Sequence, residues 1–274
     1  MPSLRFLVIL AAGAVAGGCG PTAQAPSAEA SMSGVAAATA PQASPPSQTP
    51  SPTAPAPSSA PPSFALGSGP IDPANFSATV DNPWFPLIPG TVFTSVGERD
   101  GKAVDIFTVT RDTKVIDGVT CVVVDDRGII DGVLEERTLD YYTQDLAGNV
   151  WYFGEDTQEL DAKGHVTSTE GTWHAGVDGA TPGIYMEANP VVGHTFRQEF
   201  YKDHAEDQFI VKDLAASIKV PYGVFNDALL TEEWTTLEPD VLDHKYYVKG
   251  IGQVLEVAVK GPVERLALTK VVRP

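Results

Sequence analysis

The side chains best suited to bind or transform a small molecule lie in the last third of this sequence, where acidic residues alternate with aromatic ones. Strand-like segments contain or adjoin four such residues, Glu199, Glu206, Glu233 and His244. Carboxylates beside an imidazole can hold a divalent metal ion or act as a general acid and base. Because alternate residues of a strand share one face, strand pairing could bring these four side chains together inside a barrel.

A second interpretation of this region is a binding cavity without catalysis. Aromatic walls with a few polar groups are the usual composition of a small-molecule site. The candidate ligand-binding residues are Arg197, Glu199, Glu206, Glu233, Trp234, His244 and Tyr246. A third interpretation is structural, with Arg197 and Lys245 pairing with the acids across strands on a solvated face.

No established catalytic or metal-binding motif accompanies these residues. The sequence has no Gly-x-Ser-x-Gly elbow, no complete Gly-x-x-x-x-Gly-Lys-Ser/Thr loop, no His-Glu-x-x-His pair and no Cys-x-x-Cys. We therefore expect a binding module rather than an enzyme, with no catalytic residue, metal ligand or cofactor assigned. The alternatives are a metal-assisted or acid–base hydrolase of the cell envelope and a structural envelope protein.

Charge is distributed unevenly along the 274 residues. Residues 1–63 carry only Arg5 and Glu29, which cancel, so the net charge of −17 belongs to residues 64–274. A domain this acidic repels nucleic-acid phosphates and anionic lipid headgroups. We expect no nucleic-acid partner, whereas cationic partners are compatible with the charge.

The N-terminus has the pattern of an export signal. Arg5 precedes an apolar run, 6–16, that as a helix spans roughly 16 Å, about half of a ~30 Å hydrocarbon core. Such a run is typical of a signal peptide and too short for a transmembrane helix. The residues Ala16-Gly17-Gly18-Cys19 resemble the bacterial lipobox, with Ala16 where leucine is usual.

The lipobox resemblance implies a signal peptide over 1–18 and acylation of Cys19 with palmitate or a similar chain. Two or more acyl chains form a stable anchor. The protein would then be a lipoprotein held at the extracytoplasmic face of the cell membrane. The alternative is ordinary cleavage and secretion.

Residues 19–63 are expected to form a disordered linker. After Cys19 they contain eleven prolines among Ala, Ser, Thr and Gln, and no aromatic residue. This composition cannot bury enough apolar surface to offset the entropy lost on ordering. The segment is thus a spacer between the membrane and the domain at 64–274.

Residues 64–274 have the pattern of a single all-β domain. Turn dipeptides recur about every fifteen residues, at 100–101, 117–118, 131–132, 148–149 and 163–164. Segments rich in Val, Ile, Thr and aromatic residues predict strands at 104–110, 119–124, 134–142, 150–153, 195–201, 208–212, 217–220, 229–234, 245–248, 253–259 and 265–272. These eleven antiparallel strands predict a curved sheet or barrel, with a two-sheet sandwich as the alternative.

Other segments give weaker signals. Three prolines at 83–89 exclude a helix and predict an extended segment whose Trp84 and Phe85 plug one end of the fold. The glycine-rich stretch 171–193 predicts a long loop. One helical turn is expected at 213–217, and Cys121 is expected to be a buried, unreactive side chain.

Four motifs of the domain resemble a group of uncharacterised exported bacterial lipoproteins. They are Trp-Phe-Pro-Leu-Ile-Pro-Gly at 84–90, Gly-Asn-Val-Trp-Tyr-Phe-Gly at 148–154, Val-Pro-Tyr-Gly-Val-Phe at 220–225 and Tyr-Tyr-Val-Lys-Gly-Ile-Gly-Gln-Val at 246–254. The resemblance implies a curved antiparallel sheet distantly like lipocalin or lipoprotein-carrier folds, and it implies no activity. We expect a membrane-anchored protein that binds a small or lipidic ligand or an envelope partner protein.

Overall fold

The computed structural model describes residues 71–274. This part of the chain is all-β, as expected, apart from the 3-10 helix η1 (Pro73–Asn75). No helix in it is long and apolar enough to cross a membrane. The expected signal peptide, the acylated Cys19 and the linker lie outside the described residues.

The described chain forms sixteen strands. They are β1 (Phe76–Ser77), β2 (Val92–Arg99), β3 (Lys102–Ile116), β4 (Val119–Ile130), β5 (Val133–Asp145), β6 (Val150–Leu160), β7 (Val166–Ser168), β8 (Trp173–His174), β9 (Thr181–Met186), β10 (Thr195–Arg197), β11 (Glu199–Phe200), β12 (Asp207–Val220), β13 (Gly223–Thr235), β14 (Leu242–Val248), β15 (Gly252–Lys260) and β16 (Glu264–Val272).

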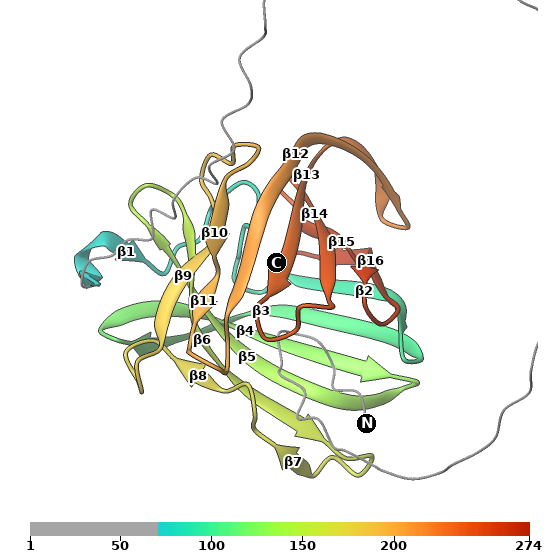
Figure 1. The fold of residues 1–274 in the computed structure, drawn as a ribbon, viewed down its shortest axis with the longest axis horizontal. Helices are drawn as coiled ribbons and strands as arrows, with labels where there is room; N and C mark the ends of the chain where they lie inside the picture. The colour runs from blue at the N-terminus through green and yellow to red at the C-terminus, as the bar shows by residue number, and fades with distance from the viewer. Residues whose placement is uncertain (1–70) are drawn as a thin grey trace, which may run out of the picture. The chain divides into compact units, whose positions relative to one another are not determined.

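Two antiparallel meanders make up the sheet. One runs through β2, β3, β4, β5 and β6, and the other through β12, β13, β14, β15 and β16 (Figure 1). They are joined where β16 pairs with β2, with Val272 opposite Val92 and Glu264 opposite Arg99. The first meander is green and the second orange to red in Figure 1, and they face each other across the interior.

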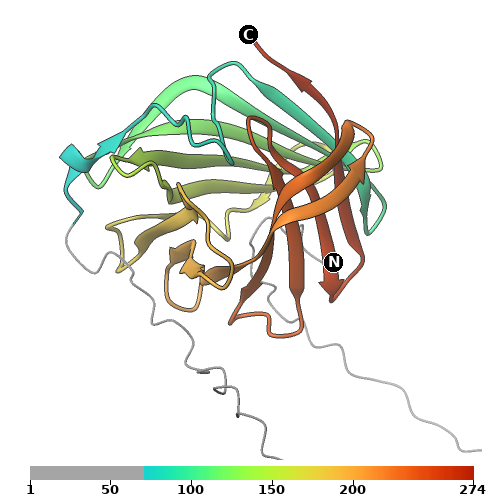
Figure 2. The same ribbon diagram turned by 90° about the horizontal axis from the view of Figure 1, so that it is seen from above.

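One short stretch of chain connects the two edges of this sheet. Strand β10 pairs with β12 at one edge, and β11 pairs with β9 at the other. Between them, the Gln198 amide donates a hydrogen bond to the Asp207 carbonyl at 2.8 Å. Because β10 and β11 are separated by Gln198 alone, the sheet closes almost completely into a barrel, as seen from above in Figure 2.

The turn dipeptides behave as predicted. Asp117 and Asp131 have φ of 47° and 50°, and the glycines that follow them have φ of 77° and 87°. Two consecutive residues with positive φ form the tight turn that matches the twist of a β-hairpin. The hairpins β3–β4 and β4–β5 therefore follow directly from local sequence.

Three expectations are corrected by the structure. The eleven predicted strands are sixteen, since β2 and several short strands were not predicted. The helical turn at 213–217 is wrong, because these residues lie within β12 where its register with β13 shifts. The loop at 171–193 is also wrong in part, because it contains β8 and β9. Strand β9 could not be predicted from residue propensities, because it contains Pro182 and Gly183, and both residue types are rare in strands.

The long β12–β13 hairpin bends over the outer face of the second meander. Near its tip, the Tyr222 amide donates to the Leu268 carbonyl of β16 at 3.0 Å. Under it lies an apolar cluster that includes Val220, Ala228, Leu255 and Leu268. Figures 1 and 2 show the hairpin crossing this wall of the barrel. The apolar side chains of the cluster pack beneath it, on the outer face.

The N-terminal segment closes one part of the interior. Phe85 is buried, with its ring 4.7 Å from that of Tyr185 and 5.3 Å from that of Tyr142. Trp84 is also buried, and the Lys249 ammonium lies 4.8 Å from its ring. Phe85 lines the interior, as the prediction requires. Trp84 instead lines a separate cavity with Lys249, and the chain turns at 83–85 rather than running extended.

Candidate binding site in the barrel interior

Two adjoining cavities occupy the interior of the barrel. The larger measures about 80 Å³ and the smaller about 70 Å³. Asp140, Tyr142 and Tyr185 line both cavities. Phe85 and Phe107 line the smaller cavity.

A bulge in β6 aims two polar side chains into the larger cavity. Tyr142 is opposite Tyr152 and Asp140 is opposite Glu155, so β6 holds one more residue than β5 between these pairs. A bulge of this kind lets both ends of the insertion face the same side. Gly154, with φ of 136°, makes it possible, since a Cβ there would lie 2.3 Å from the Trp173 carbonyl oxygen.

Asp140, Tyr152 and Glu155 form a buried chain of hydrogen bonds. The Tyr152 hydroxyl oxygen lies 2.7 Å from Asp140 Oδ1 and 3.1 Å from Glu155 Oε2. A hydroxyl has one hydrogen to donate, so one of the two carboxyl groups must supply its own proton. Burial raises the pKa of Glu155 well above its usual range, and it raises that of Asp140 to about 7. The Tyr152 hydroxyl thus links the two carboxyl groups, and their raised pKa values favour a proton on at least one of them.

The facing wall carries a buried ion pair. Lys245 Nζ lies 3.0 Å from Glu233 Oε2 and 3.7 Å from Glu256 Oε1. Glu233 also accepts hydrogen bonds from Thr231 Oγ1 at 2.7 Å and from Gln198 Nε2 at 3.3 Å. Burial lowers the pKa of Lys245, but the two carboxylates outweigh it and hold the pKa well above its usual range.

Several acceptor atoms around the cavities lack a hydrogen bond of normal geometry within the described residues. At the larger cavity these are Glu155 Oε1 and Gln198 Oε1. At the smaller cavity they are Asp105 Oδ1 and Asp126 Oδ1. Glu155, Gln198 and Asp126 are each at most 3% exposed. A buried acceptor without a donor costs about 1–3 kcal/mol, so native proteins rarely keep several together.

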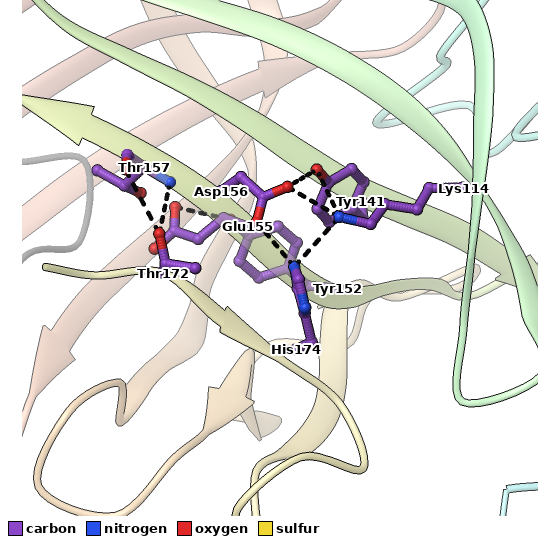
Figure 3. A network of polar contacts seen from close by, with 8 residues as sticks. All are labelled: Lys114, Tyr141, Tyr152, Glu155, Asp156, Thr157, Thr172 and His174. Atoms are coloured by element: carbon purple, nitrogen blue, oxygen red, sulfur yellow. Dashed lines mark hydrogen bonds and ion pairs between the residues drawn. The ribbon is translucent and has the colours of Figure 1, made fainter. Parts of the chain in front are cut away.

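The outer face of β6 has a different polar network, shown beside Glu155 in Figure 3. Asp156 Oδ2 lies 2.8 Å from Lys114 Nζ, and Asp156 Oδ1 lies 2.9 Å from His174 Nε2. The Tyr141 hydroxyl also donates to Asp156. Partial burial would raise the pKa of Asp156, but the bonds from Lys114 and Tyr141 lower it overall. This network ties β3, β5, β6 and β8 together.

Three of the predicted site residues lie at the interior. Glu233 and Trp234 line the larger cavity. Glu199 is fully buried, and neither of its carboxyl oxygens has a hydrogen bond of normal geometry, although the Trp173 indole approaches it. Burial raises the pKa of Glu199 well above its usual range.

The other four predicted residues lie elsewhere, so the expected meeting of Glu199, Glu206, Glu233 and His244 does not occur. His244 pairs with Glu232 at 3.2 Å, on the face of the sheet opposite to Lys245. Glu206 accepts from Thr236 and from the Asp203 amide at the β11–β12 turn. Tyr246 packs against the apolar cluster under the hairpin, and Arg197 lies over the Phe200 ring.

Strand alternation explains these placements. Glu232 and Glu233 are neighbours on β13, as are His244 and Lys245 on β14, so one member of each pair points away from the interior. The sequence-based prediction grouped Glu233 with His244, and these two residues lie on opposite faces of the sheet. Whether any of the predicted residues binds a ligand stays a prediction.

The expected cross-strand pairing of Lys245 with an acid occurs, with Glu233, but in the interior rather than on a solvated face. Sequence reasoning missed most of the other interior residues, namely Asp140, Tyr142, Tyr152, Glu155, Tyr185 and Gln198. Asp140 and Tyr142 occupy alternate positions of β5, but the same strand also contains Glu135, Glu136 and Arg137. Its composition therefore did not show which polar side chains face inward.

Metal binding finds no geometric support in the described part of the chain. Residues 71–274 contain no group of three or more His, Cys, Asp or Glu side chains arranged to hold a metal ion. Cys121 is fully buried, and burial raises its pKa to about 12, so its thiol is unreactive as expected.

Comparisons with known proteins give likenesses of fold. No family model and no curated protein matches the chain. A protein from Bacteroides fragilis NCTC 9343, assigned as exported and with a YmcC-like fold, is similar at 14% identity, a TM-score of 0.36 and coverage of 69% of this chain and 99% of that one. A protein from Parabacteroides distasonis ATCC 8503, assigned as a lipoprotein, is similar at 12% identity, a TM-score of 0.37 and coverage of 69% and 97%. At these values neither likeness transfers a function.

Proposed function

We propose that this protein binds a small polar molecule inside its barrel, and that acylated Cys19 holds it at the extracytoplasmic face of the cell membrane. The observation that carries the proposal is the pair of acceptors, Glu155 Oε1 and Gln198 Oε1, that face the larger cavity without a hydrogen bond of normal geometry among the described residues. A ligand that donates hydrogen bonds to them would offset the cost of their burial.

The composition of the interior favours a polar ligand over a lipid. An acyl chain could not satisfy the free acceptors, and an anionic headgroup would meet the carboxyl groups of Asp140 and Glu155. The cavities of about 80 and 70 Å³ also suit a molecule with few heavy atoms. Of the ligand classes expected from the sequence, a small molecule is the one we propose.

The location rests on the sequence. The apolar run 6–16 and the lipobox-like residues before Cys19 indicate export and acylation. Radiolabelled palmitate should appear on the wild-type chain and not on Cys19→Ser, which should be released from the membrane. Membrane retention of unlabelled Cys19→Ser would overturn the anchoring.

Native mass spectrometry tests ligand binding directly. The full chain, purified in detergent from its own host, should carry a discrete mass excess beyond any acyl group. Thr235→Phe, at the rim of the larger cavity, should lose this excess, because the ring fills the space. The exposed neighbour Thr236 is the matched control, and Thr236→Phe should keep it. The proposal would be contradicted if the wild-type chain purified from host cells carried no mass beyond its acyl group.

A further inference from the structure

Resting on the proposed function, we propose that the ligand is a short aliphatic amine whose ammonium group occupies the larger cavity between Glu155, Gln198 and the neighbouring tyrosine rings. The inference deepens the proposed function by naming the ligand class. It depends on which polar atoms in the cavity are free and which are engaged.

Three of the donors at the cavity are engaged by protein groups. Lys245 is bound to Glu233 and Glu256. The Gln198 amide nitrogen donates to Glu233 at 3.3 Å, which directs its oxygen elsewhere, since a carboxylate can only accept. The Tyr152 hydroxyl contacts Asp140 at 2.7 Å. A ligand cannot rely on these donors.

Two buried acceptor atoms at the larger cavity lack a hydrogen bond of normal geometry among residues 71–274. They are Glu155 Oε1, in a carboxyl group that the Thr157 hydroxyl approaches, and Gln198 Oε1. The unpaired oxygen of Gln198 is evidence independent of the acidic residues. Its amide group is neutral, so repulsion between charges does not explain why the oxygen lacks a donor. An ammonium group offers three donors and accepts nothing, which complements this set.

The aromatic lining fits a cation as well. Tyr142 and Tyr152 are stacked with centroids 4.8 Å apart, and Tyr185 lies 5.0 Å from Tyr142. Rings of this kind attract ammonium groups through their negative faces. An anion would be repelled both by these faces and by the carboxylates around them.

The smaller cavity indicates what the rest of the ligand is. Phe85, Phe93 and Phe107 offer apolar surface for a methylene chain. The carboxyl groups of Asp105 and Asp126, which share a hydrogen bond, line the same cavity. Asp140, Tyr142 and Tyr185 line both cavities, so an amine held in the larger cavity would lie beside the smaller one. A diamine would meet acceptors at both ends.

Charge balance supports a cation of this type. Burial raises the pKa of both Glu155 and Asp126 well above the usual range, and neighbouring carboxyls act in the same direction. Both groups therefore favour the protonated form. An arriving ammonium group would favour the carboxylate, so binding should release protons to solvent and strengthen as the pH rises.

Isothermal titration calorimetry of the full chain in detergent tests the inference with 1,4-diaminobutane as the probe. The diamine should bind, and 1,4-butanediol, which matches its length without charge, should not. Repeating the titration in two buffers with different ionisation enthalpies should reveal proton release. Glu155→Gln and Gln198→Met should each weaken binding roughly tenfold or more, as expected for loss of a bond to a charged donor.

Asp156→Asn is the matched control, because Asp156 is adjacent in sequence but lies on the outer face, and its binding should equal that of the wild type. Equal binding of the diol, or unchanged affinity in folded Glu155→Gln, would overturn the inference. If amines fail but a native ligand of another class is found by mass spectrometry, the ligand class is wrong and the proposed function stands. If neither binds, both fall.

Discussion

Glu155 and Asp156 are consecutive residues of β6, and their carboxyl groups lie on opposite faces of the sheet with pKa values shifted in opposite directions. Glu155 faces the interior, where burial raises its pKa. Asp156 faces outward, where bonds from Lys114 and Tyr141 lower its pKa. Figure 3 shows both side chains. The two side chains are both carboxylic acids, so the face of the sheet on which each lies determines the direction of its pKa shift.

Replacing each of these two carboxyls by its amide should change stability in opposite directions. Glu155→Gln should raise the melting temperature at pH 8 by roughly 2–4 °C, as about 1 kcal/mol does in a domain of this size, because a charge no longer has to be buried. At pH 4, where the unfolded chain also holds much of this proton, the gain should shrink to a fraction of this value. Asp156→Asn should cost less than ~1 kcal/mol, since its ion pair with Lys114 is partly exposed. Thermal unfolding of both variants at the two pH values measures this, and destabilisation by Glu155→Gln at pH 8 would contradict it.

The stability of the whole domain should fall as the pH rises from about 4 to 8. The folded-state pKa of Asp140 is raised to about 7 and that of Glu136 to about 8, in both cases chiefly by burial. Ordinary values are about 3.9 and 4.3, so the folded state retains protons that the unfolded chain has already released. A raised pKa gives stability that is complete below the unfolded value and is lost through the folded one. Urea unfolding midpoints across this range would reveal the decline, and a steady rise would show that these carboxyls are charged without cost.

The buried pair of Lys245 and Glu233 should be sensitive to the loss of either member. In Glu233→Gln, the carboxylate that still pairs with Lys245 is that of Glu256, at 3.7 Å. The substitution should lower the free energy of unfolding by about 3 kcal/mol. Glu232→Gln, its neighbour on the outer face, breaks partly exposed contacts with Lys212 and His244 and should cost less than ~1 kcal/mol. Denaturant unfolding of the two variants measures both losses of unfolding free energy. Equal losses would mean that the pair of Lys245 and Glu233 is not shielded from water.

Closure of the barrel should depend on the absence of a side chain at Gly183. A Cβ there would lie 2.2 Å from the Arg197 carbonyl oxygen, where β9 meets the β10–β11 corner. Gly183→Ala should therefore cost about 2–3 kcal/mol through overpacking. Gly164 is the control, since its φ of 80° is strained for alanine but nothing lies within 4 Å of a Cβ there, and it should cost about 1 kcal/mol. Hydrogen exchange should show loosened β9 and β11 amides in Gly183→Ala, and protection equal to that of wild type would argue against this role.

Local patterns accounted for the hairpins but not for the strands at the closure. Asp117-Gly118 and Asp131-Gly132 form turns because those residues accept positive φ wherever they occur. Strand β9, with Pro182 and Gly183, has the composition of a loop and forms a strand only because β6 and β11 pair with it. Propensity describes a residue in isolation, and here pairing between distant segments outweighs it.

The sequence by itself determined that this chain is all-β and where its principal hairpins turn. It also indicated Glu199, Glu233 and Trp234 as candidates for the interior. Only the tertiary structure decided which face of each strand is the inside. Alternation along β15 separates Leu255 from Glu256 but does not say which points inward. The β12–β13 hairpin covers the outer face, so Leu255 packs outward beneath it and Glu256 lines the cavity. That outcome depends on contacts such as Tyr222 with Leu268, between segments that local periodicity cannot connect.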